Sequence, residues 1–161
     1  MSIVLIYNNK EEYIIIPNEA IRVRVIANSN NDKDVIIKEK LKDKLNGELN
    51  ILLNDVTTIN DVRNRIDNNL DFINSFVDKS LKELGSNIDY SIKFGMNYFP
   101  EKVFNGIQYD SGLYESLVVT LGKGLGPNYW CVLYPPLCSI DNDIDEIEYR
   151  SFIKDIIDNY L

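Results

Sequence analysis

The stretch from Asp110 to Asp141, DSGLYESLVVTLGKGLGPNYWCVLYPPLCSID, concentrates the most unusual residues of the chain. It holds the only Trp, both Cys and three of the five Pro. Apolar and polar residues partly alternate from Leu113 to Leu121, which predicts a strand. A glycine-rich segment at 122–127 interrupts the pattern, and a second apolar run follows at 129–134. The stretch therefore predicts two strands joined by a glycine hairpin turn.

Upstream, residues 20–28 predict another strand, because Ile21, Val23 and Val25 alternate with Arg22 and Arg24. Two accounts of the arginines stay open. They form a solvated strand face opposite acidic cross-strand neighbours, or they contact a partner protein. Residues 8–19 predict a polar turn and a short apolar run that Pro17 stops, which forms an edge strand or a packed arm.

Apolar residues at helical spacing predict two long helices and a closing one. The first begins at Asn30, Asn31 or Asp32, which are capping residues, with a kink or break expected near Gly47. The second starts at a capping-box-like pattern, with Thr58 three residues before Asp61, and runs from 59 to 84 as one rod of about 40 Å, at about 1.5 Å per residue. The apolar positions that carry the three helices are Ile37, Leu41, Leu45, Leu49, Val62, Ile66, Ile73, Val77, Ile153, Ile156 and Ile157.

These elements, with a strand expected at 88–99 and a polar connection at 100–112, predict an α+β fold. We expect a single domain with a mostly antiparallel sheet of about four strands, packed against the two long helices plus the C-terminal helix. A chain of 161 residues can bury a core of its own. We expect residues 1–19 to form an N-terminal arm and residues 20–161 to form the domain.

The charge of the chain bears on its partners. With 25 acidic and 17 basic residues the net charge is -8, which repels nucleic-acid phosphates and anionic lipid headgroups. No apolar stretch reaches the roughly 20 residues of a membrane span, and no basic segment precedes an apolar run of signal-peptide length. We therefore expect neither a nucleic-acid partner nor electrostatic docking on membranes.

Several kinds of catalytic or metal site have no support in the sequence. The chain has no His, which removes Ser–His and Cys–His nucleophile pairs. The glycines at 122–126 precede an apolar run instead of a helix, so a phosphate cradle is not expected. Asp141, Asp143 and Asp145 match half of a calcium loop, but Glu146 replaces the required Gly and Phe152 the required Glu. We predict no catalytic residue, no metal, no cofactor and no small-molecule substrate.

The pairing of Cys131 and Cys138 stays open. If residues 131–138 run extended, the two Cα atoms lie about 23 Å apart at roughly 3.3 Å per residue, too far for a disulfide. Two separate thiols then result. Only a chain reversal at Pro135 and Pro136 would bring the cysteines together.

The aromatic residues around the second apolar run are the remaining candidates for a functional site. One account places Tyr114, Tyr129, Trp130 and Tyr134 in the core. In the other, some of these rings form an exposed contact patch with the stiff segment that ends in Leu137. The residues predicted to contact a partner are Tyr129, Trp130, Tyr134, Leu137, Arg22 and Arg24.

Two motifs resemble the signature of a known family. They are GLYESLVV at 112–119, with the glycine segment and NYWCVLYPPLC at 128–138, and IRVRVIANS at 21–29. Together they closely resemble stage II sporulation protein R, a signalling protein family of spore-forming bacteria, over roughly residues 20–141. The chain departs from the family pattern at Tyr129, where a second Trp is typical, and at Ser139, where an aromatic is common.

The resemblance implies a signal exported from the forespore into the space between two membranes. There it would activate a membrane-embedded aspartic protease of the mother cell, which cleaves the sigma-E precursor. The apolar run Ile3–Tyr7 stands where the family carries an export or membrane segment, so we expect a trimmed export protein. The alternatives are a small extracytoplasmic hydrolase that uses Ser or Cys with a Lys base, or a pair of carboxylates, and a structural or self-assembling coat component.

Overall fold

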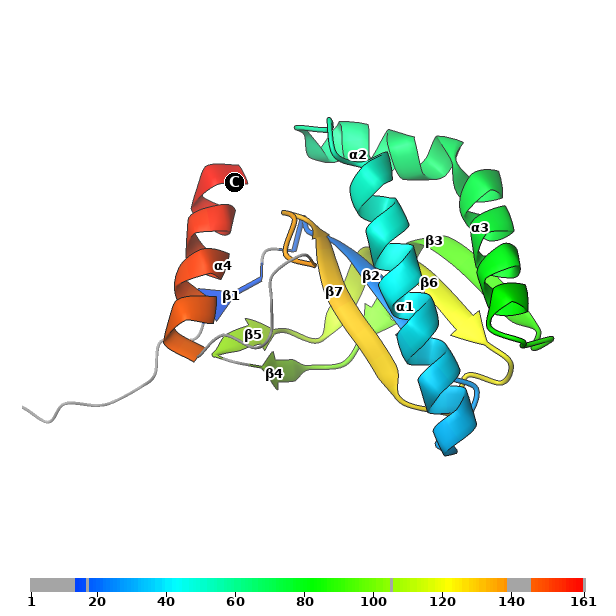
Figure 1. Cartoon of the computed structure of the whole chain (residues 1–161). Coiled ribbons are helices and arrows are strands. Elements are labelled where there is room, and N and C mark those ends of the chain that lie inside the picture. The colour runs from blue at the N-terminus through cyan, green and yellow to red at the C-terminus, as the bar shows by residue number, and fades with distance from the viewer. Residues whose placement is uncertain (1–13, 17, 105, 139–145, 161) are drawn as a thin grey trace, which may run out of the picture.

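The computed structural model describes residues 14–16, 18–104, 106–138 and 146–160 (Figure 1). Its helices are α1 (Asp32–Leu52), α2 (Ile59–Asn68), α3 (Leu70–Glu83) and α4 (Glu146–Tyr160). Its strands are β1 (Ile14–Ile15), β2 (Ile21–Ile26), β3 (Tyr90–Phe99), β4 (Lys102–Phe104), β5 (Ile107–Tyr109), β6 (Gly112–Leu121) and β7 (Asn128–Tyr134).

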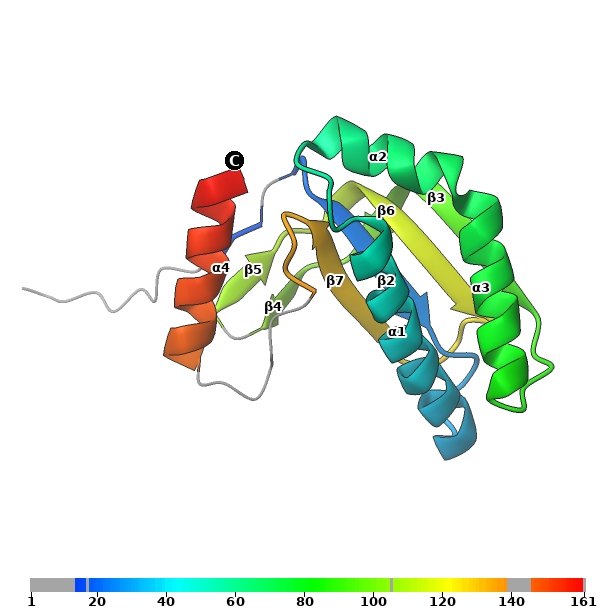
Figure 2. The ribbon, with the colours of Figure 1, turned by 45° about the horizontal axis from the view of Figure 1, so that its top comes forward.

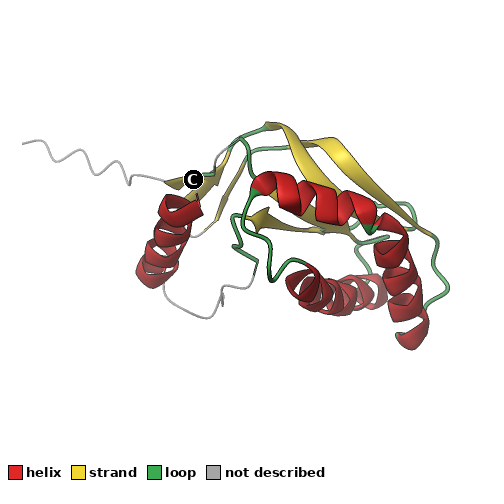
Figure 3. Ribbon diagram, turned by 90° about the horizontal axis from the view of Figure 1, so that it is seen from above, coloured by secondary structure: helices red, strands yellow, loops and turns green. Residues whose placement is uncertain are grey.

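The main sheet has the order β3-β6-β2-β7, and α1, α2 and α3 lie on one of its faces (Figure 3). The β3–β6 and β2–β7 pairs are antiparallel, and the β2–β6 pair is parallel. A smaller sheet, β1-β5-β4, lies beside β7 together with α4 (Figure 1). The predicted α+β class, with a mostly antiparallel four-stranded sheet and a closing helix, is confirmed.

The predicted hairpin between β6 and β7 is wrong, because β2 lies between these two strands. Val23 of β2 faces Leu117 of β6 on one side and Cys131 of β7 on the other. The glycine segment instead crosses the end of β2, where Leu125 N–H donates to the Asn28 carbonyl at 3.0 Å. A Cβ at Gly126 would collide with the Ser29 carbonyl, so this close crossing requires glycine there.

The alternation in β2 places its apolar residues under the helices. Ile21, Val23 and Val25 are buried in one core with the adjoining strands and the helical stripes. The remaining buried members of this core are Ile37, Leu41, Leu45, Leu49, Val62, Ile66, Ile73, Val77, Leu81, Leu117, Val119, Leu121, Leu133 and Tyr134. The predicted helical core positions are therefore confirmed, and the arginines of β2 face the opposite side of the sheet.

The predicted caps are confirmed, but two expectations about the helices are wrong. Asn31 accepts a hydrogen bond from Asp34 N–H, and Thr58 accepts one from Asp61 N–H. α1 runs without a break through Gly47. The second rod divides at Asn69, whose backbone (φ -118°, ψ 18°) is not helical, and α2 and α3 wrap around the sheet at an angle (Figure 2).

The expected polar connection at 100–112 contains β4 and β5, which pair antiparallel, and β5 also pairs with β1. On the side of the main sheet where β4 and β5 lie, a second and smaller group of apolar residues is buried. Its buried residues are Ile16, Ala20, Ile107, Val132, Leu137 and Ile153. Ile153 belongs to α4, so this core attaches the closing helix. In the main sheet, β3 pairs with β6 from Tyr90 to Phe99, and the register does not shift at Gly95.

Several expectations lie outside the described residues. They concern the apolar run at 3–7, Ser139, and the three aspartates of the partial calcium pattern. Among the helices that the structure describes, none has the length and apolar character needed to cross a membrane.

The chain reverses directly after β7, and this decides between the two accounts of the cysteines. Pro135 and Pro136 lie in a turn, and Leu137 N–H donates to the Val132 carbonyl at 3.1 Å. The Cα atoms of Cys131 and Cys138 are 5.4 Å apart and the residues form a disulfide. The extended segment with two separate thiols is therefore wrong, because the proline turn folds the chain back onto its own strand.

Removing this disulfide should lower stability by about 2.5 kcal/mol, the loop-closure entropy of a loop of about eight residues. The comparison is the Cys131→Ser/Cys138→Ser double variant with the wild-type chain, measured by urea denaturation. A reducing agent should destabilise the wild-type chain by the same amount and leave the double variant unchanged. Equal stability of the oxidised wild type and the variant would contradict the prediction.

Candidate partner-binding surface

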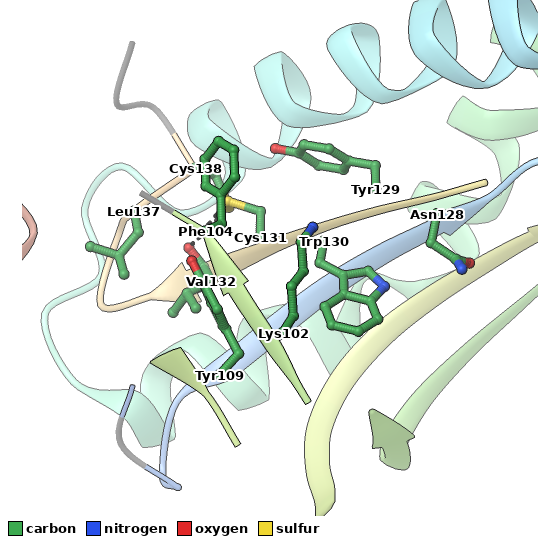
Figure 4. Close-up of a pocket in the computed structure, with 10 residues that line it drawn as sticks. All are labelled: Lys102, Phe104, Tyr109, Asn128, Tyr129, Trp130, Cys131, Val132, Leu137 and Cys138. Atoms are coloured by element: carbon green, nitrogen blue, oxygen red, sulfur yellow. Dashed lines mark hydrogen bonds between the residues drawn. A yellow bond between two sulfur atoms is a disulfide. The ribbon is translucent and has the colours of Figure 1, made fainter. Parts of the chain in front are cut away.

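A pocket of about 150 Å³ lies beside β7, between this strand and the β4–β5 pair (Figure 4). Binding sites for small molecules are usually about 300–1,000 Å³, so this pocket suits a single side chain better than a cofactor or substrate. The residues that line it are Lys102, Phe104, Tyr109, Asn128, Tyr129, Trp130, Cys131, Val132, Leu137 and Cys138. It therefore adjoins three of the six predicted contact residues, namely Tyr129, Trp130 and Leu137.

Trp130 lies half-buried on the side of the sheet that faces away from α1, α2 and α3. Its ring makes an edge-to-face contact with Phe99, with centroids 5.4 Å apart. The Arg24 guanidinium lies 5.6 Å and the Lys102 ammonium 5.1 Å from the ring centroid. Cations at this range interact favourably with the π face of an indole. The indole Nε1–H is buried without a hydrogen-bond partner in the described part of the chain.

Tyr129 points to the opposite side of β7, toward α1. Asn46 Nδ2 donates to its hydroxyl at 2.9 Å, and the Lys42 ammonium lies 4.8 Å from its ring centroid. Burial raises the pKa of Tyr129 above its ordinary value, so the hydroxyl stays neutral at physiological pH. Tyr129 and Trp130 thus cannot meet a partner on the same face of the strand, but both border its edge.

Tyr134 and Leu137 are too deeply buried to belong to an exposed contact patch, with exposed fractions of 6% and 5%. The Tyr134 hydroxyl donates to the Thr57 carbonyl at 3.2 Å, which ties β7 to the loop before α2. Leu137 belongs to the smaller core and forms a wall of the pocket. Tyr134 therefore anchors the fold, and Leu137 shapes the pocket from inside.

The expected solvated face with acidic neighbours is wrong for Arg22, whose exposed fraction is 1%. Its cross-strand neighbours are Ser116 and Val132, and its guanidinium lies 3.6 Å from the centroid of the Tyr114 ring. Burial lowers the pKa of Arg22, an effect opposed by Tyr114. None of its three guanidinium nitrogens has a hydrogen-bond partner among the described residues. Packing against aromatic rings, and not solvent, surrounds this cation.

Arg24 is partly exposed, two residues further along β2. Its cross-strand neighbours, Val118 and Trp130, are also not acidic. The guanidinium donates to Asn128 Oδ1 and to the Tyr98 carbonyl, both at 3.3 Å. Burial lowers its pKa from the ordinary value. Arg24 remains available to a partner, whereas Arg22 supports the surface from beneath.

Sequence reasoning missed Lys102, Phe104 and Tyr109 because it assigned residues 100–112 to a polar connection. A usable signal was present in the sequence, KVFNGIQY at 102–109, in which an Asn-Gly dipeptide separates two short apolar runs. Asn-Gly between such runs is a strong indication of a tight hairpin. Groups of three or more His, Cys, Asp or Glu side chains suited to a metal are not found in the part of the chain that the structure describes.

Comparisons with known proteins match the region that contains the two motifs at 21–29 and 112–138. A family model described as "Stage II sporulation protein R (spore_II_R)" matches residues 17–144. The chain is also 36% identical over 133 residues to "Stage II sporulation protein R" of Bacillus subtilis (strain 168). That alignment covers 83% of this chain and 59% of the relative, so the chain spans little more than half of the relative's length. No solved structure gives a significant match.

The burial of Arg22 leads to a stability prediction. Replacement with Met keeps most of the packing volume and removes a desolvated charge, so Arg22→Met should cost less than about 1 kcal/mol. Arg22→Ala opens a cavity against Tyr114 and Phe99 and should cost about 2–4 kcal/mol. Denaturant unfolding of both variants measures the difference. Equal losses of stability in the two variants would contradict this prediction, because they would mean that the charge of the guanidinium, and not its packed volume, stabilises this part of the structure.

Proposed function

This chain belongs to the stage II sporulation protein R family, and we propose that it is an exported signal that activates a membrane-embedded aspartic protease during sporulation. The protease then processes the sigma-E precursor. Family membership supports a role in sporulation and agrees with a non-enzymatic protein; the protease, the precursor and the site of action are parts of the proposal.

The observation that carries the proposal is the position of Trp130. This residue of the family-like motif lies half-buried at the edge of the main sheet, beside a pocket sized for one side chain and near two cations. Trp and Arg residues in such settings often dominate the binding energy of protein interfaces. The arrangement suits protein recognition, with Trp130 and Arg24 meeting the partner.

The lining of the pocket also bears on the hydrolase alternative. Among the residues that the structure describes, the ten that line it include no Ser, Thr, Asp or Glu, and its two cysteines are joined to each other. The described lining of the pocket therefore supplies neither a Ser–Lys pair nor a pair of carboxylates. A disulfide in a small protein is typical of oxidising compartments outside the cytoplasm, which supports the proposed export.

A signal of this kind acts by differential affinity. The protease must exist in an inactive and an active arrangement, and this chain must bind the active one more tightly. Equal affinity for both arrangements would leave their populations unchanged. The contact surface therefore has to recognise a feature that only the active protease presents.

Co-expression in a host that does not sporulate tests the proposal. The chain carries an export signal, and the cognate protease and sigma-E precursor are present in the same cells. Cleavage of the precursor should require the chain and should fall at least about tenfold with Trp130→Ala, since truncating an interface anchor costs roughly 2 kcal/mol or more. The readout is the ratio of cleaved to intact precursor.

Phe72→Ala is the matched control, because Phe72 is a partly exposed aromatic residue on α3. It should leave cleavage unchanged. Circular dichroism and thermal unfolding establish that both variants fold, and fractionation of the cells establishes that both are exported. If precursor cleavage does not depend on the chain despite export and folding, the signalling role is rejected; if Trp130→Ala signals normally, the assignment of the surface is rejected.

A further inference from the structure

Among the residues that the structure describes, no strand pairs with the backbone groups on the outer edge of β7. In the part of the chain that the structure describes, β2 is the only strand paired with β7. Pro127 O accepts from Ala27 N–H on the β2 side, whereas Val132 O accepts from Leu137 N–H on the outer side. Because backbone groups alternate along a strand, the N–H and C=O groups of Asn128 and Trp130 point outward, like those of Val132.

The proline turn limits how much of this edge is open. The Val132 carbonyl already accepts a hydrogen bond from Leu137 N–H, and the disulfide between Cys131 and Cys138 holds the turn against the strand. The edge that remains for pairing is therefore the segment from Asn128 to Trp130. Short open edges are one way in which proteins restrict uncontrolled pairing between sheets. This one can accept a short extended segment.

Basic side chains gather around the open edge, although the chain carries a net charge of -8. Lys102 and Arg24 lie near the Trp130 ring on one face of β7, and Lys42 lies over Tyr129 on the other. Lys38 is close as well: burial, and then the charge of Lys38, lower the pKa of Lys102.

The carboxylates in this region neutralise only part of this charge. Glu39 pairs with Lys38 at 2.9 Å and with Lys42 at 2.7 Å, and Asp43 pairs with Lys42 at 3.4 Å. Within the described residues, Lys102 and Arg24 form no ion pair with a carboxylate. An incoming segment that carries carboxylates would complement the two unpaired cations beside Trp130.

We propose that an extended, acidic segment of a partner protein adds as a strand to the edge of β7 at Asn128–Trp130. Its backbone pairs with the outward groups of Asn128 and Trp130, and a carboxylate lies near Lys102 and Arg24. A second copy of this chain is disfavoured as occupant, because pairing two β7 edges would bring like charges together. This inference rests on the proposed function, and it adds the chemistry of the segment that the partner contributes.

Trp130 is the only Trp of the chain, so its fluorescence reports on this edge alone. The probe is a short acetylated and amidated peptide of alternating threonine and glutamate, added to the full chain. A saturable change in Trp130 emission is expected below about 1 mM, and the corresponding threonine–lysine peptide should give none. Lys102→Glu should weaken binding of the glutamate peptide at least about tenfold.

Lys93→Glu is the charge-matched control, because Lys93 is an exposed residue of β3 at the opposite edge of the main sheet. It should bind the glutamate peptide nearly as well as the wild-type chain does. Two further peptides carry N-methyl groups on either the threonine or the glutamate amides. One of these two should lose binding, because strand addition uses the amides of alternate residues.

The proposal is overturned if the glutamate peptide gives no saturable change, or if Lys93→Glu weakens its binding as much as Lys102→Glu does. It is also overturned if the lysine peptide binds equally well, or if both N-methylated peptides bind like the parent. The measurement contains no protease. A chain that triggers precursor cleavage without binding the peptide contradicts only this inference, and one that binds the peptide without triggering cleavage contradicts only the signalling role.

Discussion

β2 pairs with β6 on one side and with β7 on the other, and this position determines which face of the sheet each of its side chains enters. Because side chains alternate along a strand, this placement puts Val23 and Val25 under the helices and turns Arg22 and Arg24 to the other face. A shift of one residue would exchange the two sets and bury both arginines in the main core. The glycine segment exists in its present form because the chain must cross the end of β2 closely.

The second face of the sheet follows from the same constraint. Arg22 is covered by aromatic rings, of which Tyr114 is the nearest, and β5 and α4 extend this cover through the smaller core. These elements do not cover the outer edge of β7, where the proline turn and its disulfide leave a short segment of the strand open. The side-chain pocket, the Trp130 ring and the unpaired cations meet there. In this account the family-like motif builds both the centre of the sheet, through β6, and its recognition edge, through β7.

Much of the fold could be predicted from residue patterns. Local periodicity was sufficient for α1, β2, β3, β6, β7 and α4, and for the caps at Asn31 and Thr58. The break at Asn69 was not predictable from the pattern, because apolar residues keep helical spacing on both sides of it. The hairpin error arose because β2 enters between two strands that are consecutive in sequence, and no local signal marks such long-range pairing. Of the candidate site, the aromatic strand was recognised, whereas the burial of Arg22 and the contribution of Lys102 depend on tertiary contacts.

Recognition at the edge of β7 can be tested by amide hydrogen exchange of the chain, measured with and without the detergent-solubilised protease. The amides of Asn128 and Trp130 face outward from the edge strand and should exchange readily in the isolated chain. Binding of the protease at the edge of β7 should slow exchange at these two amides, while α2 and α3 keep their rates. Slowed exchange confined to the exposed surfaces of α2 and α3, with β7 unchanged, would place the contact on the helical face and contradict the account.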